Sequence, residues 1–272
     1  MNDSDSTDKN SNQYEENISN FNYDSKDLGN FEWVKYILIS TFKVYLNNIF
    51  TFILISLIPV GIFNILRYVF IPNINELNQN ELNGLQLFFF GVLLITGFFV
   101  SILATAALSI KINALTFGKK LNVFDSYISV LPKIRTLFIA NLVFFILFFA
   151  AALLSITIFG LPLLFLLMVN FSFFNQMILF EDMGPIESFP GSYELVKTFR
   201  IRIFFVILFI LILLLFMYSL VWIIEPKINL INNLIFSILE ITIFPITGIV
   251  PITGITTMLI YIDIKKRKSV KR

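Results

Sequence analysis

Of the 272 residues in this chain, 57% are hydrophobic and only 14% are charged, and the formal net charge is +2. Soluble domains carry roughly 45–50% apolar and about 25% charged residues. A mean hydropathy of +0.84 therefore excludes an ordinary soluble fold and predicts an all-α integral membrane protein. The chain has no cysteine and no histidine, which excludes disulfides, thiolate chemistry and the commonest general base and metal ligand. We expect no cofactor.

Residues 1–30 are rich in Asn, Asp and Ser, and they carry seven acidic and two basic side chains. A segment of this composition cannot bury enough apolar surface to offset its ordering entropy. We expect a disordered acidic tail in the cytoplasm, with an acidic docking arm as the alternative.

Six apolar runs follow, and each is close to the roughly 20 residues that cross a hydrocarbon core of about 30 Å. They are Ile49–Phe70, Leu85–Leu108, Leu137–Ile158, Leu161–Phe180, Ile203–Ile224 and Ile241–Ile262. Gly160 and Pro162 favour a tight turn between the third and fourth runs, so we expect a hairpin there. The sequence predicts a domain of six transmembrane helices over residues 31–264.

The distribution of basic residues predicts the orientation of these spans. Of the 20 Lys and Arg residues, 18 fall before the first span, after the even-numbered spans or in the C-terminal tail, and only Arg67 and Lys227 fall on the other side. Because cytoplasmic loops carry an excess of Lys and Arg, we expect a cell-membrane protein with both termini in the cytoplasm. The tail 265–272 is basic, and Lys265–Lys268 would attract anionic lipid headgroups or simply anchor the chain.

A short segment with amphipathic helical spacing precedes each odd-numbered span. In the first, Trp33, Phe42 and Leu46 share the apolar side and Ser40 lies on the polar side; the second begins at Val123. In the third, Ile186 and Val196 are on the apolar side and Ser188 is on the polar side. Three repeats of one cytoplasmic interfacial helix and two spans would explain this pattern. The alternative is that orientation alone places basic residues beside every hairpin.

The third segment carries a family resemblance. Glu181-Asp182-Met183-Gly184, Ser188 and Ser192-Tyr193-Glu194-Leu195-Val196-Lys197 lead into an apolar span, and Pro251 and Leu259-Ile260-Tyr261-Ile262-Asp263 precede the basic tail. This pattern resembles the membrane domains that accompany glycerophosphodiester phosphodiesterases, and their stand-alone six-helix relatives. In the fused relatives a separate soluble barrel carries the chemistry, and no segment here corresponds to that barrel. The resemblance implies a membrane fold with an envelope- or lipid-associated role, and it assigns no catalytic residue.

Polar residues inside the membrane are candidates for function because burying them is costly. Ser172, Asn175 and Gln176 lie within about 100° of one another on an ideal helix, whereas Asn170 points elsewhere. They predict either a polar path or hydrogen bonds between helices.

The last span contains a duplication, Pro245-Ile246-Thr247-Gly248-Ile249 and Pro251-Ile252-Thr253-Gly254-Ile255. Two prolines and two glycines so close together predict a kinked or broken helix, which transporters use to bind ions, although both residues are common in membrane helices. Glu240 precedes this span. We expect it at the wet end of an outer interfacial helix rather than buried in the membrane.

Small or polar residues recur at every fourth position of the second span. They are Gly97, Ser101, Thr105, Ser109 and Asn113. Such a row lets a neighbouring helix approach closely, and we expect it to face another helix of the bundle rather than to line a pore.

These features predict a non-catalytic multi-pass membrane protein with a lipid- or envelope-associated role. The alternative is a small-molecule transporter or exporter that uses the polar residues of the fourth span and a broken sixth helix. A membrane-embedded enzyme is disfavoured because histidine, cysteine and intramembrane acids are scarce or absent. We expect no nucleic-acid partner.

Overall fold

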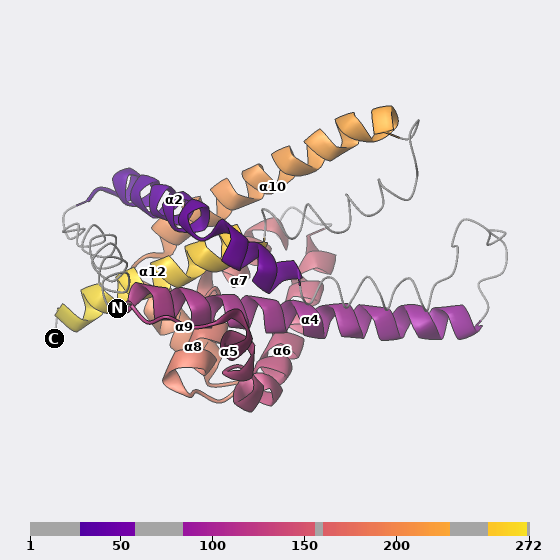
Figure 1. The fold of residues 1–272 in the computed structure, drawn as a ribbon, viewed down its shortest axis with the longest axis horizontal. Helices are drawn as coiled ribbons and strands as arrows, with labels where there is room; N and C mark the ends of the chain where they lie inside the picture. The colour runs from indigo at the N-terminus through magenta and orange to yellow at the C-terminus, as the bar shows by residue number, and fades with distance from the viewer. Residues whose placement is uncertain (1–27, 58–83, 156–159, 229–249, 271–272) are drawn as a thin grey trace, which may run out of the picture.

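The computed structural model describes residues 28–57, 84–155, 160–228 and 250–270, and these ranges are helical with no strand among them (Figure 1). Within these ranges the prediction of an all-α fold is confirmed. The helices are α2 (Asn30–Asn47), α4 (Gly84–Thr116), α5 (Val123–Ile128), α6 (Ile134–Leu154), α7 (Gly160–Asn170), α8 (Phe174–Glu181), α9 (Ser188–Val196), α10 (Arg200–Ile228) and α12 (Val250–Val270), with a 3-10 turn at Leu131–Lys133. The acidic segment before residue 28, the second half of the first span, Glu240 and the first copy of the duplication lie outside the described residues.

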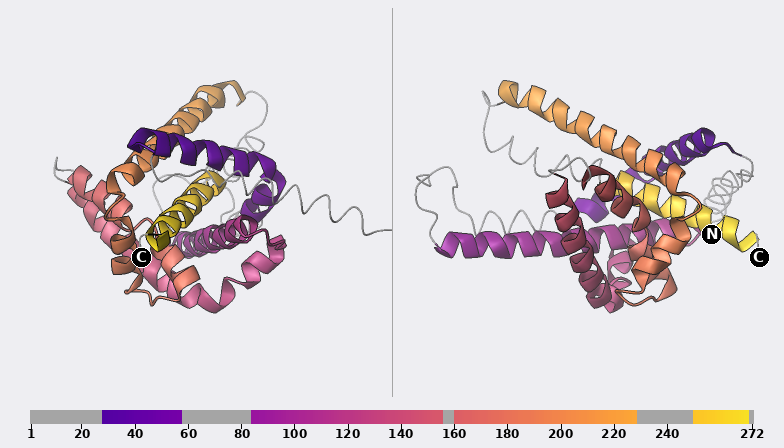
Figure 2. Two further views of the ribbon diagram at one scale, coloured as in Figure 1. Left: turned by 90° about the vertical axis from the view of Figure 1, so that its left-hand side faces the viewer. Right: turned by 180° about the vertical axis from the view of Figure 1, so that it is seen from behind.

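The C-terminal helix α12 forms the centre of the packing. It lies between α2 and α4, and α2 also contacts α10. In Figure 2 the yellow helix runs through the middle of the others. Its side chains Ile255, Met258 and Ile264 are fully buried. The core is therefore built around the last helix of the chain.

Three helical segments of the described ranges are long and apolar enough to cross a membrane: Ile95–Thr116, Val123–Leu154 and Gly160–Glu181. A fourth is reached if α2 and the adjoining helix Ile49–Leu57, which are bent by 81°, count as one span. This is fewer than the six predicted spans, parts of which lie outside the described residues.

Helix α6 exposes an apolar surface that fits lipid. Its side chains at Phe145, Ile146 and Phe149 are 52%, 60% and 55% exposed. Water-soluble proteins rarely expose apolar side chains in such a continuous patch. The exposed surface thus agrees with membrane association.

Two helix boundaries differ from the predicted spans. Helix α4 continues past Leu108 to Thr116, and the buried Lys111 in this extension donates to the carbonyl oxygen of Leu121. It stops where Gly118 adopts a φ of 68°, a left-handed conformation typical of helix C-termini. The fourth span is not one helix, since the chain turns between Asn170 and Phe174.

Helices form at all three predicted interfacial segments, as α2, α5 and α9. The predicted polar and apolar sides are partly wrong. On α2, Ser40 and Thr41 are buried, whereas Phe42 and Leu46 are exposed. The cause is packing against α12, where the hydroxyl oxygens of Thr41 and Thr256 lie 3.2 Å apart.

The third segment needs the same correction. Ser188 is fully buried and donates to the carbonyl oxygen of Pro185 at 2.9 Å, whereas Ile186 precedes the helix and is exposed. Ser188 can be buried because its hydroxyl group is already hydrogen-bonded.

Candidate functional site

The site begins at the break between α7 and α8. The hydroxyl oxygen of Ser192, on α9, accepts from the Phe173 N–H at 3.1 Å and donates to the Asn170 carbonyl oxygen at 2.9 Å. Ser192 is fully buried. Free backbone groups in apolar surroundings need such partners, and this one side chain supplies two of them. The break is therefore a stable part of the fold.

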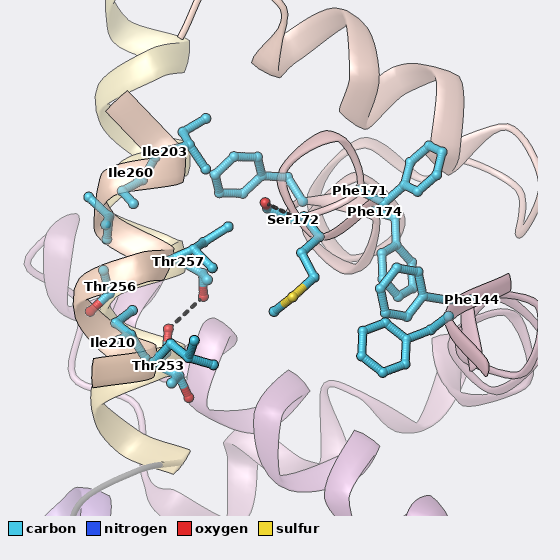
Figure 3. Close-up of a pocket in the computed structure, with 16 residues that line it drawn as sticks. Phe144, Phe171, Ser172, Phe174, Ile203, Ile210, Thr253, Thr256, Thr257 and Ile260 are labelled. Carbon is cyan, nitrogen blue, oxygen red and sulfur yellow. Dashed lines mark hydrogen bonds between the residues drawn. The ribbon is translucent and has the colours of Figure 1, made fainter. Parts of the chain in front are cut away.

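A cavity of about 300 Å³ lies beside this break (Figure 3). Helices α6, α7, α8, α10 and α12 and the turn between α7 and α8 all contribute to its wall. The lining residues are Phe144, Phe148, Met168, Phe171, Ser172, Phe173, Phe174, Ile203, Val206, Ile207, Ile210, Leu211, Thr253, Thr256, Thr257 and Ile260.

Most of the cavity wall is aromatic or aliphatic, and its hydroxyl groups are already engaged. Ser172 donates to the carbonyl oxygen of Met168 at 2.7 Å, Thr256 to that of Ile252 at 2.7 Å, and Thr257 to that of Thr253 at 2.9 Å. None of the described lining residues carries a charge. Because an unpaired charge is costly to bury, the cavity suits an apolar chain or ring rather than an ion.

The structure does not bring the predicted polar residues of the fourth span to one face. Ser172 lines the cavity, but Asn175 points to α6 and accepts from Asn141 at 2.8 Å. Gln176 and Asn170 are buried, and their side-chain oxygens have no hydrogen-bond partner. Of the three predicted residues only Ser172 lines the cavity, and the chain turns between Asn170 and Phe174, where an unbroken helix was expected.

The described part of the predicted broken sixth helix is a regular α-helix from Val250. Pro251 is in its first turn. Proline is tolerated there because an N–H at that position would have no hydrogen-bond partner within the helix. The second copy of the duplication supplies Thr253 to the cavity and Gly254 to the packing against α4. A break in the first copy would fall outside the described residues.

The row of small residues on α4 is not a continuous contact surface. Ser109 is buried, Gly97, Thr105 and Asn113 are half-buried, and Ser101 is exposed. The Thr105 and Ser109 hydroxyl groups donate to carbonyl oxygens of their own helix. A neighbouring face of α4 packs against α12, where a Cβ added at Gly254 would lie 3.6 Å from Leu108.

Acidic residues of the family pattern pair with basic residues near the end of α12 and the start of α6. Glu181 pairs with Lys265 at 2.7 Å and accepts from the Tyr261 hydroxyl at 2.9 Å. Asp182 pairs with Lys133 at 2.6 Å. These carboxylates tie the loop after α8 to α12 and α6. Within the described ranges no cluster of three or more acidic side chains is arranged to hold a metal ion.

Helix α12 continues through the predicted basic tail to Val270, and its last basic residues contact the protein. Lys268 donates to the Glu194 carbonyl oxygen at 2.5 Å, and Arg267 pairs with Asp263 at 2.7 Å. Sequence reasoning missed the contact of Lys268 with Glu194 because the two residues lie 74 positions apart in the chain. The pair of Asp263 and Arg267 has the i, i+4 spacing of a helix and could have been found from the sequence.

Compared with protein-family models, with curated proteins and with solved structures, the chain matches none.

Proposed function

We propose that this chain is a non-catalytic, multi-pass membrane protein that binds the apolar part of a lipid-like molecule in the cavity beside the α7–α8 break. The observation that carries the proposal is the lining of that cavity, which is uncharged and has its Ser172, Thr256 and Thr257 hydroxyl groups bonded to backbone oxygens. A wall of this kind favours hydrocarbon, since no polar group must be left unpaired when an apolar chain enters.

The proposal includes six transmembrane helices in a cell membrane, with both termini in the cytoplasm. It is supported by the helical segments that are long enough to cross and by the one-sided distribution of Lys and Arg. Three repeats of one interfacial helix and two spans are the simplest arrangement. The presence of α2, α5 and α9 before long apolar helices supports it.

A role without catalysis is supported by the sequence, which has neither histidine nor cysteine. It also agrees with the resemblance to membrane domains that lie beside glycerophosphodiester phosphodiesterases, in which a separate barrel carries the chemistry. The resemblance implies an envelope- or lipid-associated process.

A transporter of polar solutes is the alternative, and it has less support. Asn175, the central residue of its proposed path, is hydrogen-bonded to Asn141 away from the cavity. Such a transporter would give substrate-dependent flux in proteoliposomes. Asn175→Leu would abolish this flux, whereas a substitution that fills the cavity would leave it unchanged.

The test is to fill the cavity and measure the lipid that purifies with the protein. Ile207 lines the cavity, and Ile212, on the same helix, is 56% exposed. We expect Ile207→Trp to lose a lipid that the wild-type protein and the Ile212→Trp control retain in native mass spectrometry. If Ile207→Trp is folded and carries the same lipid in the same amount, the cavity is not the binding site.

A further inference from the structure

Two arginines from different helices lie over one aromatic ring. The guanidinium carbons of Arg202, near the start of α10, and Arg267, near the end of α12, are 5.7 and 5.9 Å from the centre of the Phe199 ring. Arg202 also lies 5.8 Å from the Trp33 ring of α2. Three helices thus bring two like charges together at one end of the core.

One carboxylate pairs directly with Arg267, one of these two arginines. Asp263 Oδ2 accepts from Arg267 Nε at 2.7 Å and from Trp33 Nε1 at 2.7 Å. Arg202 Nε donates at 2.7 Å to the Asn30 side-chain oxygen, which is neutral. Burial and then the charge of Arg267 lower the pKa of Arg202, against the opposing effect of Asp263. The two cations and this one anion leave an excess positive charge.

Each of the two guanidinium groups also has a donor without an acceptor. Arg202 Nη1 and Arg267 Nη2 are buried and have no hydrogen-bond partner. A buried charged donor without a partner is costly. Both residues are intermediate in exposure, so the cluster lies at the edge of the core, close to the surface.

We propose that Arg202 and Arg267 form a phosphate-binding site. Phosphate oxygens accept several hydrogen bonds at once, and the planar forks of arginine match them. A phosphodiester carries a single negative charge, which balances the excess charge of the cluster. In a membrane this group is supplied by a phospholipid headgroup, because basic residues near the membrane surface attract anionic headgroups. The headgroup source rests on the proposed membrane placement, whereas the phosphate site itself does not depend on the cavity.

The experiment follows Trp33 fluorescence in the full-length protein in neutral detergent. The chain has two tryptophans, so Trp222→Phe leaves Trp33 as the only reporter. Short-chain phosphatidylglycerol and inorganic phosphate are titrated in parallel. Arg202→Gln removes a guanidinium group whose hydrogen bonds are to neutral groups. Arg202→Lys keeps the positive charge but not the planar guanidinium group. Arg135→Gln is the control, since it removes an exposed arginine near the start of α6.

We expect a saturable change in the emission of the parent protein and of Arg135→Gln. Binding by Arg202→Gln should be at least tenfold weaker, and Arg202→Lys should recover only part of it. A response to the lipid alone identifies the headgroup as the source, and a response to both probes identifies phosphate in general. Equal binding by Arg202→Gln and its parent, or equal weakening in Arg135→Gln, refutes the site.

The chain's own acidic segment is the competing occupant, since the carbonyl oxygen of Leu28 lies 3.4 Å from Arg202 Nη2 and the seven acids of the tail precede it. If the protein ignores both phosphate probes but its Trp33 emission changes when Asp24 and Asp27 are replaced by Asn, these arginines bind that segment. The phosphate assignment is then wrong.

Discussion

Between α7 and α8, the hydroxyl group of Ser192 takes the place of two backbone hydrogen-bond partners. Replacing Ser192 by Ala removes the hydrogen-bond partner of the Phe173 N–H and of the Asn170 carbonyl group. Ser192 is fully buried, so water does not replace it. We expect a loss on the order of 2 kcal/mol in the free energy of unfolding, because each unsatisfied buried group costs about 1–3 kcal/mol. Thermal unfolding in detergent measures it.

Ser129→Ala is the control for this change. Ser129 is exposed at the C-terminal end of α5, and its hydroxyl group donates to the Asp125 carbonyl oxygen of that helix. We expect a change below about 0.5 kcal/mol, as for most surface substitutions. Equal losses in the two variants would show that the bridge across the break does not stabilise the protein.

The hydrogen bond between Trp33 and Asp263 joins α2 to α12 from a fully buried indole ring. Trp33→Phe keeps most of the apolar contact and removes the donor. We expect a loss of about 1.5–3 kcal/mol, because the acceptor is a carboxylate. A double-mutant cycle with Asp263→Asn tests the cause. Strictly additive losses in the cycle would mean that the bond contributes nothing of its own.

On α4, the difference between two serines of one row predicts opposite results. Ser109 is 4% exposed, whereas Ser101 is exposed. Ser109→Leu should lower the free energy of unfolding by about 1–3 kcal/mol, because the larger side chain overpacks the interface. Ser101→Leu should leave it nearly unchanged. Urea unfolding in mild detergent compares the two, and similar effects would place both serines in the same environment.

Gly254 tests how closely α4 and α12 pack. An added Cβ would meet Leu108 at 3.6 Å, an ordinary van der Waals distance. Gly254→Ala should therefore be neutral or stabilising by up to about 1 kcal/mol, since alanine favours the helix. Gly254→Leu should be destabilising by about 1–3 kcal/mol. Both are measured by thermal unfolding, and a clear loss with alanine would show that the helices are closer than described.

Helical periodicity was enough to predict that helices form near α2, α5 and α9 but not what they bury. The apolar spacing placed α2, α5 and α9 correctly. It failed at Ser40, which it placed on the polar side and which is buried. The neighbouring Thr41 is also buried, and its hydroxyl oxygen lies 3.2 Å from that of Thr256 on α12. The break before Phe174 was also missed, since no glycine or proline marks it and its partner, Ser192, lies in a later helix.

At the scale of the molecule, composition predicted the class of protein but not the arrangement of helices. The amount of apolar sequence required a membrane or an unusually large core. The central place of α12 depends on contacts with helices much earlier in the chain. Such contacts leave no periodic signal, and neither does a cavity formed by residues from five helices. The polar residues of the fourth span were found by sequence, yet only Ser172 reaches that cavity.

The absence of cysteine makes the proposed orientation directly testable. We expect single cysteines at Ser129 and Lys197 to be protected from a membrane-impermeant maleimide in intact cells, and one at Ser155 to react at once. The reason is that Ser129 and Lys197 lie beside basic loops, which remain in the cytoplasm, whereas Ser155 follows α6, at the end opposite to Ser129. Permeabilised cells should label all three. Protection of Ser155 together with reaction at Ser129 would invert the orientation, and identical labelling at both would mean that α6 does not cross the membrane.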